Sequence, residues 1–140
     1  MATESIILNE RAGALAQYPH AKRVGDLIFV SGVSSRRPDN SHEGVTIHGD
    51  GRVELDITAQ THAVIKNIQV ILQAAGADLE DVVDMTTFLM KMSDFKGYNA
   101  VYNEYFKATP GPSRTTVAVS EFPHPNLLIQ MKAIAYKPKK

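Results

Sequence analysis

The stretch 58-TAQTHAVIKNIQVILQAAGADLEDVVDMTTFLMKM-92 predicts a long helix followed by a central strand. Apolar residues recur at helical spacing in its first half: Val64, Ile68, Leu72 and Ala75. Thr58 is expected to cap the start of this helix, and Gly76 is expected to follow its last turn. Residues 82–92, at the end of the stretch, are rich in β-branched side chains, which favour a strand.

A second helix is expected after this strand, over residues 94–108, with Ser93 as its cap. Aromatic side chains lie along one side of this segment, and the prolines at 110 and 112 prevent the helix from continuing. Two further strands are predicted over residues 114–120 and 127–136, separated by the turn 122-FPHPN-126.

The chain before the long helix predicts a hairpin and then a loop. The hairpin is 20-HAKRVGDLIFVSG-32, which turns at Gly25 and Asp26, and 4-ESIIL-8 predicts a short edge strand. Residues 34–52 are mostly polar residues and glycine, which indicates a long loop. Loops of this length in compact domains are often functional.

These elements predict an α+β fold in a single domain over residues 1–140. Its simplest form is one mixed β-sheet with both helices on one face. The strand expected over 82–92 is apolar or threonine on both of its sides, so the sheet face without helices is also expected to be buried. Another copy of the chain can cover that face, which predicts a closed homo-oligomer.

The composition argues against several classes of function. Fifteen basic and fifteen acidic residues balance, so no net field attracts nucleic acid or an anionic membrane. The absence of cysteine excludes disulfides, thiol nucleophiles and cysteine-bound zinc. No window is apolar enough for a signal peptide or a membrane span, so a cytoplasmic protein is expected. The five histidines, at positions 20, 42, 48, 62 and 124, show no metal-ligand spacing, and no metal site is expected.

The stretch 110-PGPSRTTVAV-119 presents one arginine at the start of a strand. Pro110 and Gly111 suit the centre of a type II turn, in which the glycine takes a positive φ, and Pro112 restricts the chain further. The guanidinium of Arg114 is therefore held firmly. It either grips a carboxylate through two parallel hydrogen bonds or pairs with an acid on the surface.

Two more arginines are adjacent in 34-SSRRPDN-40, directly after the strand that ends the hairpin. Arg36 and Arg37, with Ser34 or Ser35, form either a second anion site or an ordinary solvated loop.

Five segments resemble the RidA/YjgF family over nearly the whole chain: 24-VGDLIFVSG-32, 60-QTHAVIKNIQVILQAAGADLEDVVDMTTFL-89, 94-DFKGYNAVYNEYF-106, 110-PGPSRTTVAV-119 and 127-LLIQMKAIAY-136. The resemblance implies a chorismate-mutase-like α+β fold that assembles as a homotrimer with a ligand cleft between subunits. It implies that Arg114 binds the substrate carboxylate and that Tyr18 and Ser31 line the cleft. Many members hydrolyse the C=N bond of an imine or enamine acid, which gives a 2-oxo acid and ammonia.

The sequence departs from the family at a position that matters for the chemistry. The family glutamate that positions or activates water on the last strand is replaced by Gln130, and an amide cannot exchange a proton as a carboxylic acid does. This departure and 31-SGVSSRRPDN-40 resemble the 2-aminomuconate deaminases of bacterial aromatic-compound catabolism. That substrate carries two carboxylates, so Arg36 or Arg37 is expected to bind the distal one.

The reaction expected from this resemblance needs no cofactor, because the electrons come from the conjugation of the substrate. Arg114 holds the carboxylate next to the amino-bearing carbon, and the enamine tautomerises to an electrophilic imine. Water that is oriented by Gln130 and Ser31 adds to the imine, while Tyr18 closes the pocket. Ammonia leaves, and the product is 4-oxalocrotonate or its enol.

The sequence leaves other possibilities open. The group that transfers protons is open among His20, His124, Glu121, a carboxylate of the substrate and bulk water. Three other functions also stay open: hydrolysis of generic 2-imino acids, binding of small carboxylates without catalysis, and a ribonuclease or translation-inhibitor activity. The neutral net charge argues against the last of these.

Overall fold

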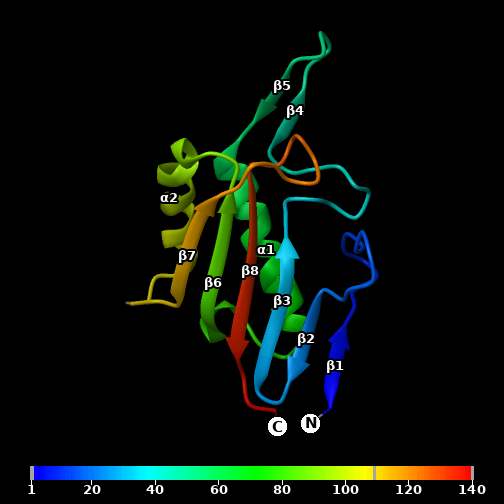
Figure 1. The fold of residues 1–140 in the computed structure, drawn as a ribbon, viewed down its shortest axis with the longest axis vertical. Coiled ribbons are helices and arrows are strands. Elements are labelled where there is room, and N and C mark those ends of the chain that lie inside the picture. Colours follow the sequence, from blue (N-terminus) through cyan, green and yellow to red (C-terminus); the bar gives the residue numbers. More distant parts are fainter. Residues whose placement is uncertain (1, 109, 140) are drawn as a thin grey trace.

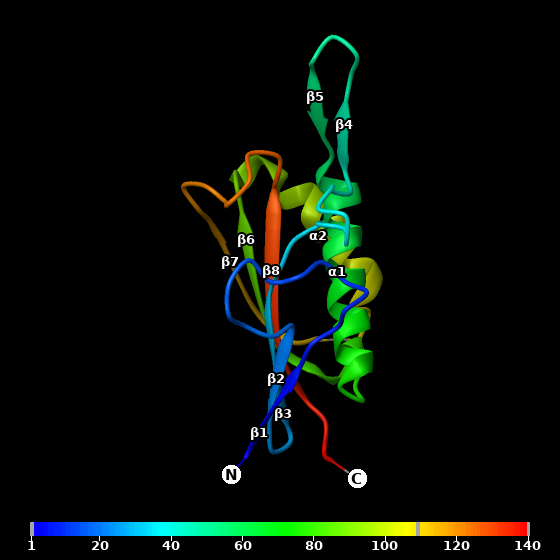
Figure 2. The same ribbon diagram turned by 90° about the vertical axis from the view of Figure 1, so that its right-hand side faces the viewer.

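The computed structural model describes residues 2–108 and 110–139, which form a six-stranded sheet with two helices on one of its faces (Figures 1 and 2). The strands of this sheet are β1 (Thr3–Ile6), β2 (Ala21–Val24), β3 (Leu27–Val33), β6 (Val82–Leu89), β7 (Ser113–Ala118) and β8 (Ile129–Tyr136). The helices are α1 (Ile57–Ala74) and α2 (Phe95–Tyr105), and short 3-10 turns lie at Leu79–Asp81 and Met92–Asp94. The predicted α+β fold is confirmed.

The sheet is mixed, with the strand order β1-β2-β3-β8-β6-β7. Strands β6 and β7 pair in parallel, and the other neighbouring strands are antiparallel. The expected short strand near the N-terminus is β1, and it lies at one edge of the sheet, while β7 lies at the other. The sheet has two β-bulges, one in β3 before Val33 and one in β6 after Val82. Each bulge changes which side chains of its strand face the helices.

The core lies between α1 and the central strands. Helix α1 buries one apolar face: Val64, Ile65, Ile68, Ile71 and Leu72. These side chains meet the buried side chains of the sheet: Ile28 and Val30 of β3, Met85 and Leu89 of β6, and Met131, Ala133 and Ala135 of β8. Each large aliphatic side chain buried in this way stabilises the fold by about 1.5–3 kcal/mol.

The opposite face of the sheet exposes large apolar side chains. Leu27 and Phe29 of β3 are 38% and 40% exposed, and their register partners on β8 are Tyr136 and Ile134. Tyr136 is 51% exposed, and Val117 of β7 is 43% exposed. A patch of this kind on a sheet usually marks an interaction surface. The sequence therefore predicted correctly that this face is apolar; which partner covers it stays a prediction.

Helix α1 begins two residues earlier than the predicted cap implies. The N-cap is Asp56, whose carboxylate accepts a hydrogen bond from the backbone N–H of Ala59, so the prediction of Thr58 was wrong. At the other end, Gly76 follows the C-cap residue Ala75 and has φ +85°. This is the left-handed conformation that glycine adopts most easily after a helix, and the prediction for Gly76 is confirmed.

The start of α2 also differs from the sequence-based expectation. A 3-10 turn over Met92–Asp94 leads into the helix, and no side chain caps it, so Ser93 does not have the expected role. The helix is instead attached to the sheet through Tyr98, whose hydroxyl lies 2.7 Å from the Thr87 hydroxyl of β6. Both groups are fully buried.

The predicted loop over residues 34–52 contains a strand that was missed. Strands β4 (Val45–Ile47) and β5 (Val53–Leu55) form a two-stranded hairpin that projects beyond the sheet and α1 (Figures 1 and 2). Its turn is closed by a hydrogen bond from the N–H of His48 to the carbonyl of Arg52 at 2.8 Å. In the part of the chain that the structure describes, no helix is long and apolar enough to cross a bilayer.

Candidate active site

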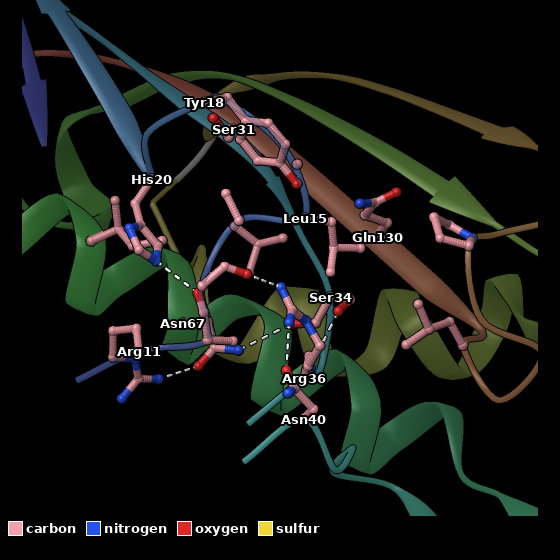
Figure 3. Close-up of a pocket in the computed structure, with 18 of the residues that line it drawn as sticks. Arg11, Leu15, Tyr18, His20, Ser31, Ser34, Arg36, Asn40, Asn67 and Gln130 are labelled. Atoms are coloured by element: carbon pink, nitrogen blue, oxygen red, sulfur yellow. Dashed lines mark hydrogen bonds between the residues drawn. The ribbon is translucent and has the colours of Figure 1, made fainter. Parts of the chain in front are cut away.

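A cavity lies where three connecting segments meet the ends of β3 and β8 (Figure 3). These segments are the N-terminal loop 9–20, the loop 34–42 and the turn 123–127. The cavity has a volume of about 360 Å³. Five of the predicted site residues line it: Tyr18, Ser31, Ser34, Arg36 and Gln130. The other two, Arg37 and Arg114, do not.

His20 fixes the N-terminal loop over the cavity. Its Nδ1 accepts a hydrogen bond from the backbone N–H of Leu8 at 3.1 Å, so the proton lies on Nε2, which donates to the carbonyl of Ala12 at 2.8 Å. Because both ring nitrogens are bonded to the backbone, His20 holds the loop and is a poor candidate for proton transfer.

Ser31 is held against the same loop. Its hydroxyl donates to the carbonyl of Pro19 at 2.8 Å, and its backbone N–H donates to the carbonyl of His20. The oxygen of the hydroxyl keeps its lone pairs for a further donor such as water. Tyr18, which directly precedes Pro19 in the chain, lines the cavity and is 47% exposed.

The two adjacent arginines of the loop 34–42 have different surroundings. Arg36 lies at the cavity, where its guanidinium donates to the side-chain oxygen of Asn40 at 2.7 Å and to the carbonyl of Gly13 (Figure 3). Arg37 instead pairs with Glu43, with 2.9 Å between Nε and Oε1. This hydrogen bond lowers the pKa of the Glu43 carboxyl. Arg36 is therefore the arginine of this pair that can meet a ligand in the cavity.

Arg11 and Asn67 were not among the predicted site residues. The guanidinium of Arg11 donates to the side-chain oxygen of Asn67, and the amide nitrogen of Asn67 donates to the carbonyl of Ser34 at 3.0 Å. Asn67 thus joins the N-terminal loop and the loop 34–42 to helix α1. The available signal was an asparagine in the middle of a helix, where this residue has no propensity advantage.

Gln130 reaches the cavity from the sheet face opposite the core. Its neighbours along β8, Ile129 and Met131, are fully buried, and Gln130 is half-buried between them. A β-carbon at Gly32 would lie only 3.1 Å from Nε2 of Gln130, so the glycine leaves the room that this amide occupies.

Arg114 lies in a separate place, on the edge strand β7. Its strand partner in β6 is Met85, which faces the core, and its guanidinium lies against the rings of α2. The distances from the guanidinium carbon to the ring centroids of Phe95, Tyr98 and Tyr102 are 5.8, 5.1 and 4.7 Å. These distances are in the range of cation–π attraction.

The side chain of Arg114 is fixed further by a hydrogen bond. It donates to the side-chain oxygen of Asn99 at 2.8 Å. The preceding Gly111 has φ +78°, which agrees with the expected turn. Burial raises the pKa of the neighbouring Tyr102 to about 12, so this phenol stays neutral. Within one chain, Arg114 and Gln130 are therefore held on opposite faces of the sheet.

Two histidines form part of the cavity wall and were not combined by the sequence analysis. The rings of His42 and His124 are 4.5 Å apart between centroids and inclined at 41°. His42 belongs to the loop 34–42, and His124 belongs to the turn before β8. Glu121, in contrast, is exposed and is not part of the wall.

Comparison with known proteins gives consistent matches over almost the full length. Residues 9–137 match the family model described as Endoribonuclease L-PSP. A RutC family protein of Pyrococcus abyssi is 41% identical over 137 residues, which cover 98% of this chain and 99% of the relative. The chloroplastic Reactive Intermediate Deaminase A of Arabidopsis thaliana is 35% identical, over 94% of this chain and 65% of the relative.

Solved structures agree with these sequence matches. The crystal structure of the yeast protein YEO7 has a TM-score of 0.83 and 34% identity, over 97% of this chain and 99% of that chain. The structure of TdcF from E. coli, solved with bound serine, has a TM-score of 0.79 and 27% identity, over 96% of this chain and 98% of that chain.

Proposed function

The chain belongs to the RidA/YjgF family, and on this premise we propose that it is a hydrolytic deaminase of 2-aminomuconate. The proposed reaction gives 4-oxalocrotonate, or its enol 2-hydroxymuconate, plus ammonia, in the bacterial breakdown of aromatic compounds. Family membership supports the general activity, because a relative in Arabidopsis is named Reactive Intermediate Deaminase A. We place the reaction in the cytoplasm, in keeping with a chain that contains no cysteine.

The observation that carries the choice of a dicarboxylate is that two of the three arginines singled out by the sequence, Arg36 and Arg114, have no carboxylate partner among the described residues. Within residues 2–108 and 110–139, Arg36 and Arg114 donate to neutral oxygens, of Asn40 and Asn99 among others. Arg37, in contrast, is paired with Glu43. The guanidinium groups of Arg36 and Arg114 can each bind one carboxylate of 2-aminomuconate, because arginine binds carboxylates through two parallel hydrogen bonds.

The two arginines come together only if two chains share one site. Arg114 lies beside α2 at the β7 edge, whereas Arg36 and Gln130 line the cavity at the ends of β3 and β8. We therefore propose a homotrimer in which Arg114 of one chain completes the cavity of the next. The exposed apolar side chains on the helix-free face supply a surface for this assembly.

In the proposed mechanism, Arg114 binds the carboxylate next to the amino-bearing carbon, and Arg36 binds the distal one. The enamine tautomerises to an imine, water adds to the C=N carbon, and the carbinolamine collapses with loss of ammonia. The Gln130 amide and the oxygen of Ser31 orient the water, and Tyr18 shields the pocket from solvent. No cofactor takes part. Fixing both carboxylates before reaction lowers the entropic part of the barrier.

Two alternatives use the same cavity. One is hydrolysis of generic 2-imino acids, which carry a single carboxylate and need Arg114 but not Arg36. The other is a trimer that binds small carboxylates without catalysis, which is favoured by the presence of Gln130 and by the serine bound to the related TdcF.

The test compares 2-aminomuconate and 2-iminopropionate, both generated in situ, by absorbance and ammonia release. Arg114→Ala is expected to lose activity on both substrates, by about 10²-fold or more, since it removes the binding of the reacting end. Arg36→Ala is expected to lose activity on 2-aminomuconate alone. Arg37→Ala is the matched control, with near wild-type rates, because its side chain is exposed and paired with Glu43. Equal losses in Arg36→Ala and Arg37→Ala would contradict the dicarboxylate assignment.

A further inference from the structure

The imidazole rings of His42 and His124 meet at the wall of the cavity that holds Arg36 and Gln130. Their ring centroids are 4.5 Å apart. Gln130 cannot exchange a proton under ordinary conditions, so the proposed hydrolysis lacks a group that moves protons. The cavity offers few other titratable groups of suitable type, since both nitrogens of His20 are bonded to the backbone.

The position of His124 is fixed by a buried glutamine. The side chain of Gln60 is fully buried and spans the turn before β8, accepting from the N–H of Leu128 and donating to the carbonyl of Asn126, both at 2.9 Å. The N–H of Asn126 in turn donates to Nδ1 of His124 at 3.1 Å. His124 is therefore oriented, with its Nδ1 used as an acceptor and its ring packed against that of His42.

His42 is placed by its own loop and has both ring nitrogens free within the described residues. An isolated antiparallel β-bridge pairs the backbone of His42 with that of Arg36, and the N–H of Glu43 donates to the carbonyl of Ser35 at 3.0 Å. The side chain of His42 is 9% exposed, at the cavity. Neither ring nitrogen is a buried atom without a partner, so both are accessible at the cavity and can contact a ligand or a water molecule.

The charges around His42 favour its neutral form. Burial is the main cause that lowers its pKa, followed by the charges of His124, Arg36 and Arg37. Arg36 and Arg37 belong to its own loop, His124 belongs to the turn before β8, and Arg11 also lines the cavity. A neutral imidazole has a lone pair that can accept a proton near neutral pH.

We propose that His42 is the residue that transfers protons in the hydrolysis, and that His124 is a positioning residue packed against it. This inference rests on the proposed deaminase function. As water bonds to the C=N carbon of the protonated imine, a ring nitrogen of His42 accepts a proton from that water and the neutral carbinolamine forms. His42 returns the proton to the amino nitrogen. The hydroxyl proton then passes to His42 as the C–N bond breaks, and ammonia leaves and takes up that proton.

The test is the pH dependence of kcat in histidine variants, with 2-aminomuconate as substrate. His42→Asn is expected to lower kcat by about 10²-fold with a small change in KM, and to remove the fall in rate at acidic pH. His124→Asn is expected to move that fall to higher pH, since it removes one of the charges that disfavour protonated His42. His48→Asn is the matched control, because His48 lies in the β4–β5 hairpin, paired with Glu54.

The results separate this inference from the proposed function. Wild-type kcat and an unchanged acidic limb in His42→Asn would overturn the inference, while loss of activity in Arg114→Ala would still support the deaminase. A wild-type protein without activity would overturn both.

A measurement on the wild type covers the case in which a variant does not fold. The ring signals of His42, followed by NMR, are expected to shift when muconate is added, and those of His48 are not. No shift of His42 with saturating muconate would overturn the inference.

Discussion

Gln130 depends on Gly32 for its place in the cavity. The glycine lies in the bulged end of β3, and its missing side chain leaves the space that the amide occupies. An amide that orients water acts through its direction, so a displacement of a few tenths of an ångström matters more here than at most surface positions.

Gly32→Ala is therefore expected to lower kcat for 2-aminomuconate by about tenfold with little loss of stability, through misplacement of the amide. The added β-carbon would lie 3.1 Å from Nε2 and 3.4 Å from Cδ of Gln130. Gly49→Ala is the control, because nothing lies within 4 Å of its β-carbon. Steady-state kinetics of both variants check this prediction, and equal rates in the two would contradict it.

The lowered pKa of His42 also predicts how the stability of the fold depends on pH. Its pKa in the folded chain is lower than the ordinary value of 6.5, so the unfolded chain binds more protons in the interval between the two values. Stability is then fully present above pH 6.5 and is lost as the pH falls towards the lower, folded value. Thermal unfolding between pH 7.5 and 5.5 measures this loss, which is expected to be smaller in His42→Gln. An identical decrease in wild type and His42→Gln would show that His42 does not contribute.

The sequence could not separate Arg36 from Arg37, because both are arginines in the same polar loop. Their difference arises from the fold of the loop, in which a hydrogen bond from the N–H of Glu43 to Ser35 and the bridge to His42 bring Glu43 beside Arg37. The pairing of His42 with His124 was also beyond local reasoning, since it depends on contacts between distant segments.

At the scale of elements, the start of α1 shows how local sequence can mislead. Thr58 and Asp56 are both good N-cap residues, and the apolar spacing did not distinguish them. In the structure the N-cap is Asp56, whose carboxylate accepts a hydrogen bond from the backbone N–H of Ala59. Helix boundaries inferred from periodicity are uncertain by a few residues for this reason.

Asp56→Ala is expected to reduce the free energy of unfolding by about 1 kcal/mol, because it leaves an N–H at the first turn of α1 without its acceptor. Thr58→Ala is expected to change it by a few tenths of a kcal/mol at most, since alanine is a good residue within a helix. Urea unfolding of the two variants measures both values. A larger effect of Thr58→Ala would contradict the assignment of the cap.

The β4–β5 hairpin was missed because each strand has three residues, which is too short for an alternating pattern to be recognised. Isolated two-stranded hairpins are marginally stable in water. The helices and long strands were predicted well, because their patterns extend over two or more turns or over six or more residues.

At the scale of the whole molecule, the apolar character of the helix-free face followed from one strand, residues 82–92. The separation of Arg114 from the cavity could not follow from sequence, because it depends on strand order. Strand β8, the last in the chain, lies between β3 and β6, and this places β7 and its arginine at the far edge. The proposed shared site is a direct consequence of that order.

The most direct test of the shared site is the activity of mixed assemblies. Arg36→Ala and Arg114→Ala chains, inactive on 2-aminomuconate alone, are unfolded together in equal amounts and refolded, and mixing is verified by native mass spectrometry. If each site takes its two arginines from different chains of a trimer, the mixture is expected to recover about a quarter of wild-type activity. Wild type mixed with the double variant should also give about a quarter. No recovery in the first mixture, with about half of the activity in the second, would show that each chain carries a complete site and would contradict the account.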